Sequence, residues 1–277
     1  MTMLRASVLV VVALSGCRGS DLSITAEPRG LSRLRHAWDW HGRMLSMSEV
    51  RSGVVRNGHN VTQQGCFGSW LSRHRQVVTV SAVGGSVTAG STTSTHGGRD
   101  VLYHSRVVRA LQVLLPANDG PHGNTNAGVS QTGPCYHELC LPRHLPSSPA
   151  LVLVDAAVNL NDDRKGVAAF ERLLRRLLRH PARPALLVVN NHNWNPSAHS
   201  AANAKVHEDG IEELCDHYRV SAVSMRRALA DSVRTGARNT STFVKPDGGR
   251  HLNEEGRLAR ILSGGPGLLF ASYDSYG

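Results

Sequence analysis

Short apolar runs alternate with amphipathic stretches along this sequence, and this alternation limits the fold more than any other feature. Strand-like runs rich in Val, Leu and Ala occupy residues 77–83, 150–158, 185–189 and 220–223. Segments with helical spacing of apolar residues occupy residues 100–115, 170–178, 201–218 and 253–262. Strands that alternate with helices need crossover connections, so the pattern predicts an α/β domain with a parallel sheet and helices on both faces.

The texture of the chain changes near residue 75. Residues 18–74 are rich in Gly, Ser and Arg with weak periodicity, which predicts an irregular N-terminal extension with one candidate helix at 31–46. The α/β pattern then defines a domain over residues 75–264, followed by a loose C-terminal tail at 265–277. A chain of 277 residues is long enough for one such domain with a full core.

The first seventeen residues have the layout of a secretory signal peptide. Arg5 precedes an apolar run at 6–14 that ends in the small residues Ser15 and Gly16, and the run is too short to span a bilayer. The alternative is a bacterial lipoprotein signal in which Cys17 is lipidated. No later segment reaches about 20 unbroken apolar residues, so a secreted chain without a membrane span is expected.

Export affects how the cysteines and two asparagines are interpreted. An even number of cysteines in an exported chain predicts up to two disulfides, with three possible connectivities. These cysteines are Cys66, Cys135, Cys140 and Cys215. The zinc alternative, formed by Cys135, His137, Cys140 and His144, fits no common structural spacing, so no metal is predicted. Acceptor triplets for N-glycosylation in a eukaryotic secretory pathway begin at Asn60 and Asn239.

The chain is strongly basic, with a net charge of +10 that arises almost entirely from arginine. Such a charge favours anionic partners, although a biased composition alone also produces it. No arginine block is interleaved with aromatic residues, as a nucleic-acid platform requires, so nucleic acid is not a predicted partner.

The first strand-like run ends in a serine between glycines, within residues 84–90 (GGSVTAG). In parallel sheets, functional groups collect at the carboxyl ends of strands. A serine on a strand-to-helix turn exposes its hydroxyl and places its N–H at a helix N-terminus, which suits attack on a carbonyl and stabilisation of the oxyanion. A phosphate-binding turn or a helix cap is the alternative. No lysine follows as in a P-loop, and Thr88 replaces the second glycine of the α/β-hydrolase elbow.

Four segments together resemble the conserved blocks of the SGNH (GDSL-like) hydrolases. Residues 84–90 are similar to the first block, with Gly85 in place of aspartate, and residues 126–133 are similar to the second. Residues 157–159 (AVN) resemble the third block, and residues 247–256 (DGGRHLNEEG) resemble the fifth. The resemblance covers residues 75–262 and implies a three-layer αβα sandwich with a flavodoxin-like parallel sheet.

The resemblance implies a role for each matching residue. Ser86 is the nucleophile, His251 is its base, and Asp247 is the acid that orients the imidazole. The oxyanion hole consists of the N–H of Ser86, the N–H of Gly128 and the side chain of Asn159. This chemistry needs no cofactor and no metal.

The sequence departs from the family pattern at two places. Leu160 stands where the third block usually has aspartate, a residue with a mainly structural role. Asp247 precedes His251 by four residues instead of three, and a bulge through the glycines at 248–249 restores the spacing. Without such a bulge, Ser86 and His251 act as a dyad.

The expected function is that of an esterase that removes acyl groups, acetyl above all, from a glycan or from a small ester. One alternative is a catalytically weak protein of the same fold that binds acidic polysaccharide through its arginines. Another is acyl transfer between sugars, which uses the same residues. His192 and Trp194, after the strand at 185–189, either line a sugar-binding cleft or pack at the strand end.

Overall fold

The computed structural model describes residues 47–56, 61–62, 65–90, 102–155, 157–160, 163–192, 194 and 198–242. These residues form a six-stranded sheet in the order β1-β8-β7-β6-β4-β5 and a separate two-stranded sheet, β2-β3. The strands of the main sheet are β1 (Val54–Arg56), β4 (Thr79–Gly84), β5 (Gly123–Gly128), β6 (Leu151–Asp155), β7 (Ala185–Asn190) and β8 (Ser221–Ser224). The small sheet pairs β2 (Val61–Thr62) with β3 (Gly65–Cys66). All pairs in the main sheet are parallel except the antiparallel pair of β1 and β8.

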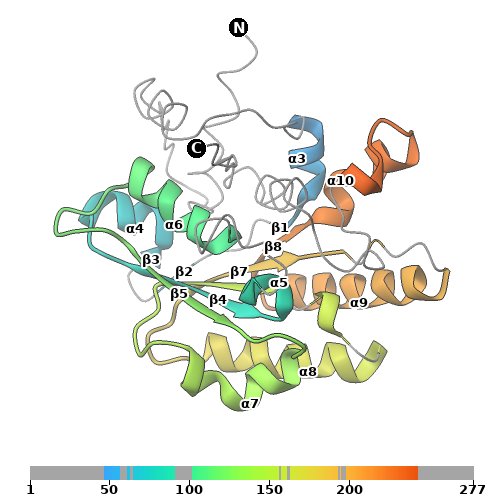
Figure 1. Cartoon of the computed structure of the whole chain (residues 1–277). Coiled ribbons are helices and arrows are strands. Elements are labelled where there is room, and N and C mark those ends of the chain that lie inside the picture. Colours follow the sequence, from blue (N-terminus) through green and yellow to red (C-terminus); the bar gives the residue numbers. More distant parts are fainter. Residues whose placement is uncertain are drawn as a thin grey trace, which may run out of the picture.

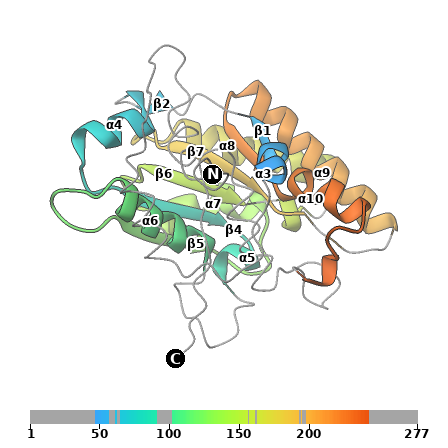
Figure 2. The same ribbon diagram turned by 90° about the horizontal axis from the view of Figure 1, so that it is seen from above.

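Helices cover both faces of the main sheet, as the alternating pattern predicts (Figures 1 and 2). One face carries α3 (Met47–Gly53), α4 (Phe67–His74), α6 (Tyr103–Leu114) and α10 (Met225–Arg234). The other face carries α7 (Pro134–His144), α8 (Asp163–Leu178) and α9 (Ala198–His217). The predicted three-layer αβα architecture with a mostly parallel sheet is therefore confirmed.

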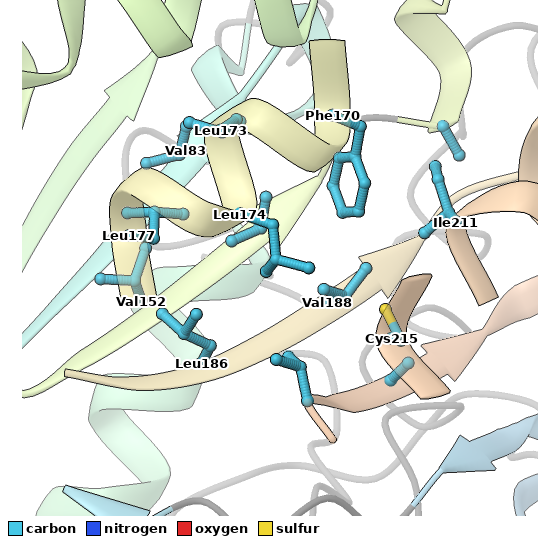
Figure 3. Packing of buried hydrophobic residues seen from close by; sticks show 14 of the residues in the cluster. Val83, Val152, Phe170, Leu173, Leu174, Leu177, Leu186, Val188, Ile211 and Cys215 are labelled. Atoms are coloured by element: carbon cyan, nitrogen blue, oxygen red, sulfur yellow. The ribbon is translucent and has the colours of Figure 1, made fainter. Parts of the chain in front are cut away.

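The buried strands supply side chains to two apolar clusters, one on each face of the sheet. Successive residues of a strand point to opposite faces. Along β7, Leu187 packs in the cluster under α4 and α6, whereas Leu186 and Val188 pack in the cluster under α8 and α9. Figure 3 shows the second cluster, where Phe170 and Leu174 of α8 lie over the sheet. The continuous apolar runs of the sequence thus reflect strands buried on both faces.

The structure differs from the predicted irregular extension over residues 18–74. Residues 47–74 contain α3, β1, the small sheet and α4, and β1 is an edge strand of the main sheet. Phe67 and Leu71 of α4 are fully buried in the core under α6. These elements are short, and a helix or strand of a few residues leaves little periodicity in a sequence. The domain therefore starts before residue 75.

Two elements inside the domain lack the pattern from which the others were predicted. β5 (GNTNAG) is polar because it lies at the edge of the sheet, where only β4 pairs with it. α7 is only weakly amphipathic and contains Pro142. No helix in the described ranges is long and apolar enough to cross a membrane.

Other predictions meet the structure only in part. Cys135, Cys140 and Cys215 are not in disulfides, so the pairings predicted for them do not form. Asn239 is exposed beyond α10, and its glycosylation stays a prediction. The predicted signal peptide at 1–17, the helices at 31–46 and 253–262, the tail at 265–277 and the acceptor Asn60 all lie outside the described residues.

Candidate active site

Ser86 is the first residue of α5 (Ser86–Ala89), a single helical turn directly after β4. Gly85 precedes it with non-helical dihedrals (φ −84°, ψ −146°), and the N–H of Ala89 donates to the Gly85 carbonyl at 2.9 Å. Gly90 ends the turn with a φ of +79°, a conformation that favours glycine. Because α5 follows the carboxyl end of β4, the half-buried Ser86 lies at the edge of the sheet where parallel α/β folds hold their sites.

A buried hydrogen-bond network holds α5 against the neighbouring elements of the fold. The hydroxyl of Thr88 is fully buried, donates to Asp155 Oδ2 at 3.0 Å and lies 3.2 Å from the Tyr103 hydroxyl. These bonds join α5 to the end of β6 and to the first turn of α6. Glycine is needed at 84, because a Cβ there would lie 2.3 Å from Thr88 Oγ1 and 2.6 Å from the Asp155 carbonyl oxygen. The nucleophile turn is thus bound to two neighbouring elements.

His137 of α7 holds the same turn from the other face of the sheet. Its Nε2 lies 2.9 Å from the Gly84 carbonyl oxygen, and because a carbonyl only accepts, Nε2 carries the proton. The same nitrogen, His137 Nε2, also lies 3.1 Å from Thr132 Oγ1. Burial lowers the pKa of His137 below its ordinary value of 6.5, which favours the neutral ring. His137 is therefore an anchor of the nucleophile turn. Among the described residues, no three side chains of the kinds that bind metals lie close enough together to hold an ion.

The side chain of Asn159 rests against the residue next to the nucleophile. Asn159 ends η2 (Ala157–Asn159), which follows β6. A Cβ built on Gly85 would fall 2.2 Å from Asn159 Oδ1 and 2.9 Å from its Nδ2. The amide therefore occupies the space that a side chain at 85 would need. This contact brings the predicted oxyanion donor to the Ser86 turn.

Gly128 lies on the opposite side of α5, as the last residue of β5 and the register partner of Gly84. A Cβ at 128 would lie 2.4 Å from the Ala89 nitrogen, so only glycine lets the strand approach the helix so closely. The Gly128 N–H donates to Asn126 Oδ1 at 2.9 Å. The Gly128 N–H can donate to an oxyanion only if it shares or breaks its hydrogen bond to Asn126 Oδ1.

The structure thus brings Ser86, Gly128 and Asn159 together around one turn. Asp247 and His251 lie outside the described residues, so the base, the orienting acid and the bulge at 248–249 stay predictions. Leu160 is buried in the apolar cluster under α8, which accounts for a leucine where the family usually has aspartate.

His192 and Trp194 follow the carboxyl end of β7 and contact each other edge to face, with ring centroids 4.8 Å apart. His192 Nδ1 also lies 3.4 Å from Glu208 Oε2. Glu208 of α9 is 1% exposed, accepts a hydrogen bond from the Ser224 hydroxyl and pairs with Arg226 Nε at 2.7 Å. His192 therefore takes part in a buried polar network at the strand ends, in addition to any contact with a ligand.

The pKa of the Glu208 carboxyl is lowered despite its burial. Burial alone raises the pKa, but the nearby His192 ring, the charge of Arg226 and the hydrogen bond from Ser224 together outweigh it. The carboxyl is thus held in its charged form. This network was not predicted from the sequence, because its members lie in α9, β8, α10 and the loop after β7.

No family model matches this sequence, and no curated protein sequence is significantly similar to it. Solved structures are similar in fold. A two-domain esterase active on acetylated mannans, co-crystallised with mannopentaose, matches with a TM-score of 0.63 and 23% identity over 76% of this chain. An acetyl-xylooligosaccharide esterase from Geobacillus stearothermophilus matches with a TM-score of 0.55 and 14% identity over 73% of this chain. The chain has the fold of the SGNH hydrolases.

The two matches differ in how much of the other protein they cover. The chain spans 54% of the two-domain esterase and 100% of the Geobacillus enzyme. The described SGNH fold therefore corresponds to about half of the first protein and to the whole of the second. At this level of identity the similarity establishes the architecture, and the chemistry must be argued from the residues at the Ser86 turn.

Proposed function

We propose that this chain is a serine esterase that removes acetyl or other acyl groups from a carbohydrate. The observation that carries the proposal is the juxtaposition at the Ser86 turn. The serine begins a helical turn at the carboxyl edge of the sheet, and the Asn159 amide lies against Gly85 beside it. A hydroxyl next to hydrogen-bond donors at a helix N-terminus is the arrangement that acyl transfer needs.

The proposed reaction proceeds through an acyl-enzyme. His251 accepts the Ser86 proton while the serine oxygen attacks the ester carbonyl, and the Ser86 N–H and the Asn159 amide bind the resulting oxyanion. As this intermediate collapses, the His251 imidazolium gives the proton to the leaving sugar oxygen, and the acyl group stays on Ser86. Water, deprotonated by His251, then attacks the acyl-enzyme. The second tetrahedral intermediate collapses, His251 returns the proton to the Ser86 oxygen, and the carboxylic acid is released. Asp247 orients the imidazole throughout.

The glycan preference is supported by what two proteins of the same fold act on. One is active on acetylated mannans, and the other is an acetyl-xylooligosaccharide esterase. The first seventeen residues, with their signal-peptide layout, support a location outside the cytosol, where such polymers occur. Recovery of the protein from culture medium, with an N-terminus shortened to about residue 18, tests this location; a full-length cytosolic product contradicts it.

Hydrolysis assays on p-nitrophenyl acetate and on acetylated mannan test the activity. Ser86→Ala and His251→Ala are each expected to lower kcat by about a thousandfold or more, because each removes a member of the reacting unit. Ser148→Ala, at an exposed serine far from the turn, is the matched control and should retain full activity. A Ser86→Ala variant as active as the parent protein would refute the proposal.

Asp247→Asn tests the orienting acid separately. If the bulge restores the family spacing, this variant loses most of kcat with little change in KM, because the imidazole tautomer is lost. Unchanged kcat would mean that Ser86 and His251 act as a dyad.

A further inference from the structure

A groove lies between α7 and α8, away from the Ser86 turn. The two helices pack side by side on one face of the sheet (Figure 1). The groove has a volume of about 800 Å³, within the range of sites that hold a ligand. It is lined by the C-terminal halves of the helices, which lead into β6 and β7 at their amino ends. It therefore opens at the edge of the sheet opposite to the one that carries Ser86.

The two walls of the groove differ in chemistry. The wall from α7 and the loop after it is largely apolar and is formed by Leu141, Pro142, Leu145 and Pro146. The wall from α8 and the residue after it is cationic and is formed by Arg172, Arg175, Arg176 and Arg179. All four arginines are exposed, so their guanidinium groups are accessible from the groove. Such a lining combines an apolar surface with several donors for an anion.

The positive charge of the groove is only partly neutralised. Arg172 Nε donates to Glu138 Oε2 at 2.9 Å, and Arg175 lies 3.8 Å from Glu171 Oε1. Arg176 donates to the Glu138 carbonyl oxygen at 2.6 Å. Within the described ranges no carboxylate lies at ion-pair distance from Arg176 or Arg179. The dipole at the C-terminal end of α8 equals about half a negative charge, which the two unneutralised arginines outweigh.

The arginines form a row along one side of α8. Arg175 and Arg176 lie three and four residues after Arg172. Arg179, just past the end of α8, lies four and three residues after them, so the four positions share one side of the helix at three levels about 5 Å apart. The row spans about 10 Å. Burial lowers the pKa of His180 at the end of the groove and favours its neutral form, so the arginines carry the positive charge. A row of cations at this spacing suits a ligand with repeated negative groups.

We propose that this groove binds a segment of an anionic polysaccharide, at a site separate from the Ser86 turn. Carboxylate or sulfate groups of the polymer pair with the arginine wall, and the C–H faces of the sugars contact the prolines and leucines. The lining contains no Phe, Tyr or Trp on which bases of a nucleic acid stack. The groove would hold the esterase on an acidic glycan.

Calorimetric titration of the full chain with oligogalacturonate and with dextran sulfate tests the site. Arg176→Gln combined with Arg179→Gln is expected to weaken binding about ten- to a hundredfold, since two charge-assisted contacts are lost. Binding should also weaken as salt is raised. Arg73→Gln combined with Arg234→Gln is the matched control. It removes the same charge from exposed arginines on α4 and α10, outside the groove, and should leave affinity within about twofold.

Ser86→Ala separates this site from the proposed esterase, because the variant should bind both polymers as tightly as the parent protein. Equal loss of affinity in the two double variants would show binding through net charge alone and would overturn the proposal. So would failure to bind either polymer at low salt. Tighter, groove-dependent binding of single-stranded DNA or of phosphatidylserine vesicles would assign the groove to a different partner and overturn it as well.

Discussion

At the residue scale, Gly85 controls the position of the Asn159 amide. Its φ of −84° lies outside the left-handed region that favours glycine, and the need for glycine comes from the contact with Asn159. A Cβ at 85 would fall 2.2 Å from Asn159 Oδ1, and the amide would have to move. The SGNH block that residues 84–90 resemble has an aspartate at this position, whereas in this chain the Asn159 side chain fills that space.

Gly85→Ala is expected to lower kcat by about a hundredfold with little change in KM, because loss of one oxyanion donor costs about that much. Steady-state hydrolysis of p-nitrophenyl acetate measures the effect. In an Asn159→Ala background the same substitution should cost little more, since the donor is already gone. Additive losses in the double variant would show that Gly85 acts through something other than Asn159.

His137 is expected to act as a positioning residue for Ser86. His137→Leu removes the donor to the Gly84 carbonyl, which should lower kcat more than it raises KM, and His137→Gln should recover part of the loss. Because the folded pKa lies below 6.5, the unfolded state binds more protons as pH falls through this window. The parent protein should therefore lose stability as pH falls from about 7 through the unfolded pKa of about 6.5, and His137→Leu should lose less. Identical pH dependence of the unfolding free energy would contradict this role.

At the scale of elements, Glu208 joins α9 to the end of β8 and the start of α10. It accepts from Ser224, which caps α10, and pairs with Arg226 of that helix. Glu208→Gln is expected to lower the free energy of unfolding by about 2 kcal/mol near neutral pH, because Arg226 loses its buried charged partner and keeps only the more exposed Asp209 carboxylate, 2.6 Å from its Nη2. Urea denaturation measures the difference. Glu213→Gln, at an exposed position on the same helix, is the control and should change stability little.

The ion pair of Glu208 and Arg226 also predicts how the free energy of unfolding changes at acid pH. The folded pKa of Glu208 is lowered, so its contribution is complete above the unfolded value of about 4.3 and is lost as pH falls through the folded pKa. The difference between the parent protein and Glu208→Gln should therefore shrink on acidification. A difference that stays constant down to about pH 3 would show that the carboxylate charge is not what stabilises the network.

An element or a contact could be predicted from the sequence when the pattern that indicates it lies within a short stretch of residues. β6 and β7 were predicted because they are buried on both faces and so consist of unbroken apolar residues. β5 was not, because an edge strand can be polar. Ser86 and Asn159 were found through short motifs. The bonds of Thr88 to Asp155 and of His137 to Gly84 were missed, since they join residues 67 and 53 positions apart.

At the scale of the whole molecule, the two inferred sites lie at opposite edges of one sheet. The Ser86 turn is at the carboxyl ends of the strands, and the arginine groove is near their amino ends. Binding at the groove therefore leaves the turn open to an acyl group on the same or a neighbouring chain. The net charge of +10 adds a long-range attraction for acidic polymers, which falls with salt.

The N-terminal elements are part of this molecule's core, and their removal should prevent folding. Phe67 and Leu71 are fully buried and Trp70 is 9% exposed, so α4 contributes about 6 kcal/mol of apolar burial at about 2 kcal/mol for each side chain. A domain of this kind has a net stability of about 5–15 kcal/mol.

A chain beginning at residue 75 also loses β1, which exposes the edge of β8. It should show no cooperative thermal transition by circular dichroism, whereas the full chain should. Phe67→Ala in the full chain should lower the midpoint without abolishing the transition. A sharp transition at the parent temperature in the shortened chain would restore the domain boundary that the sequence predicted.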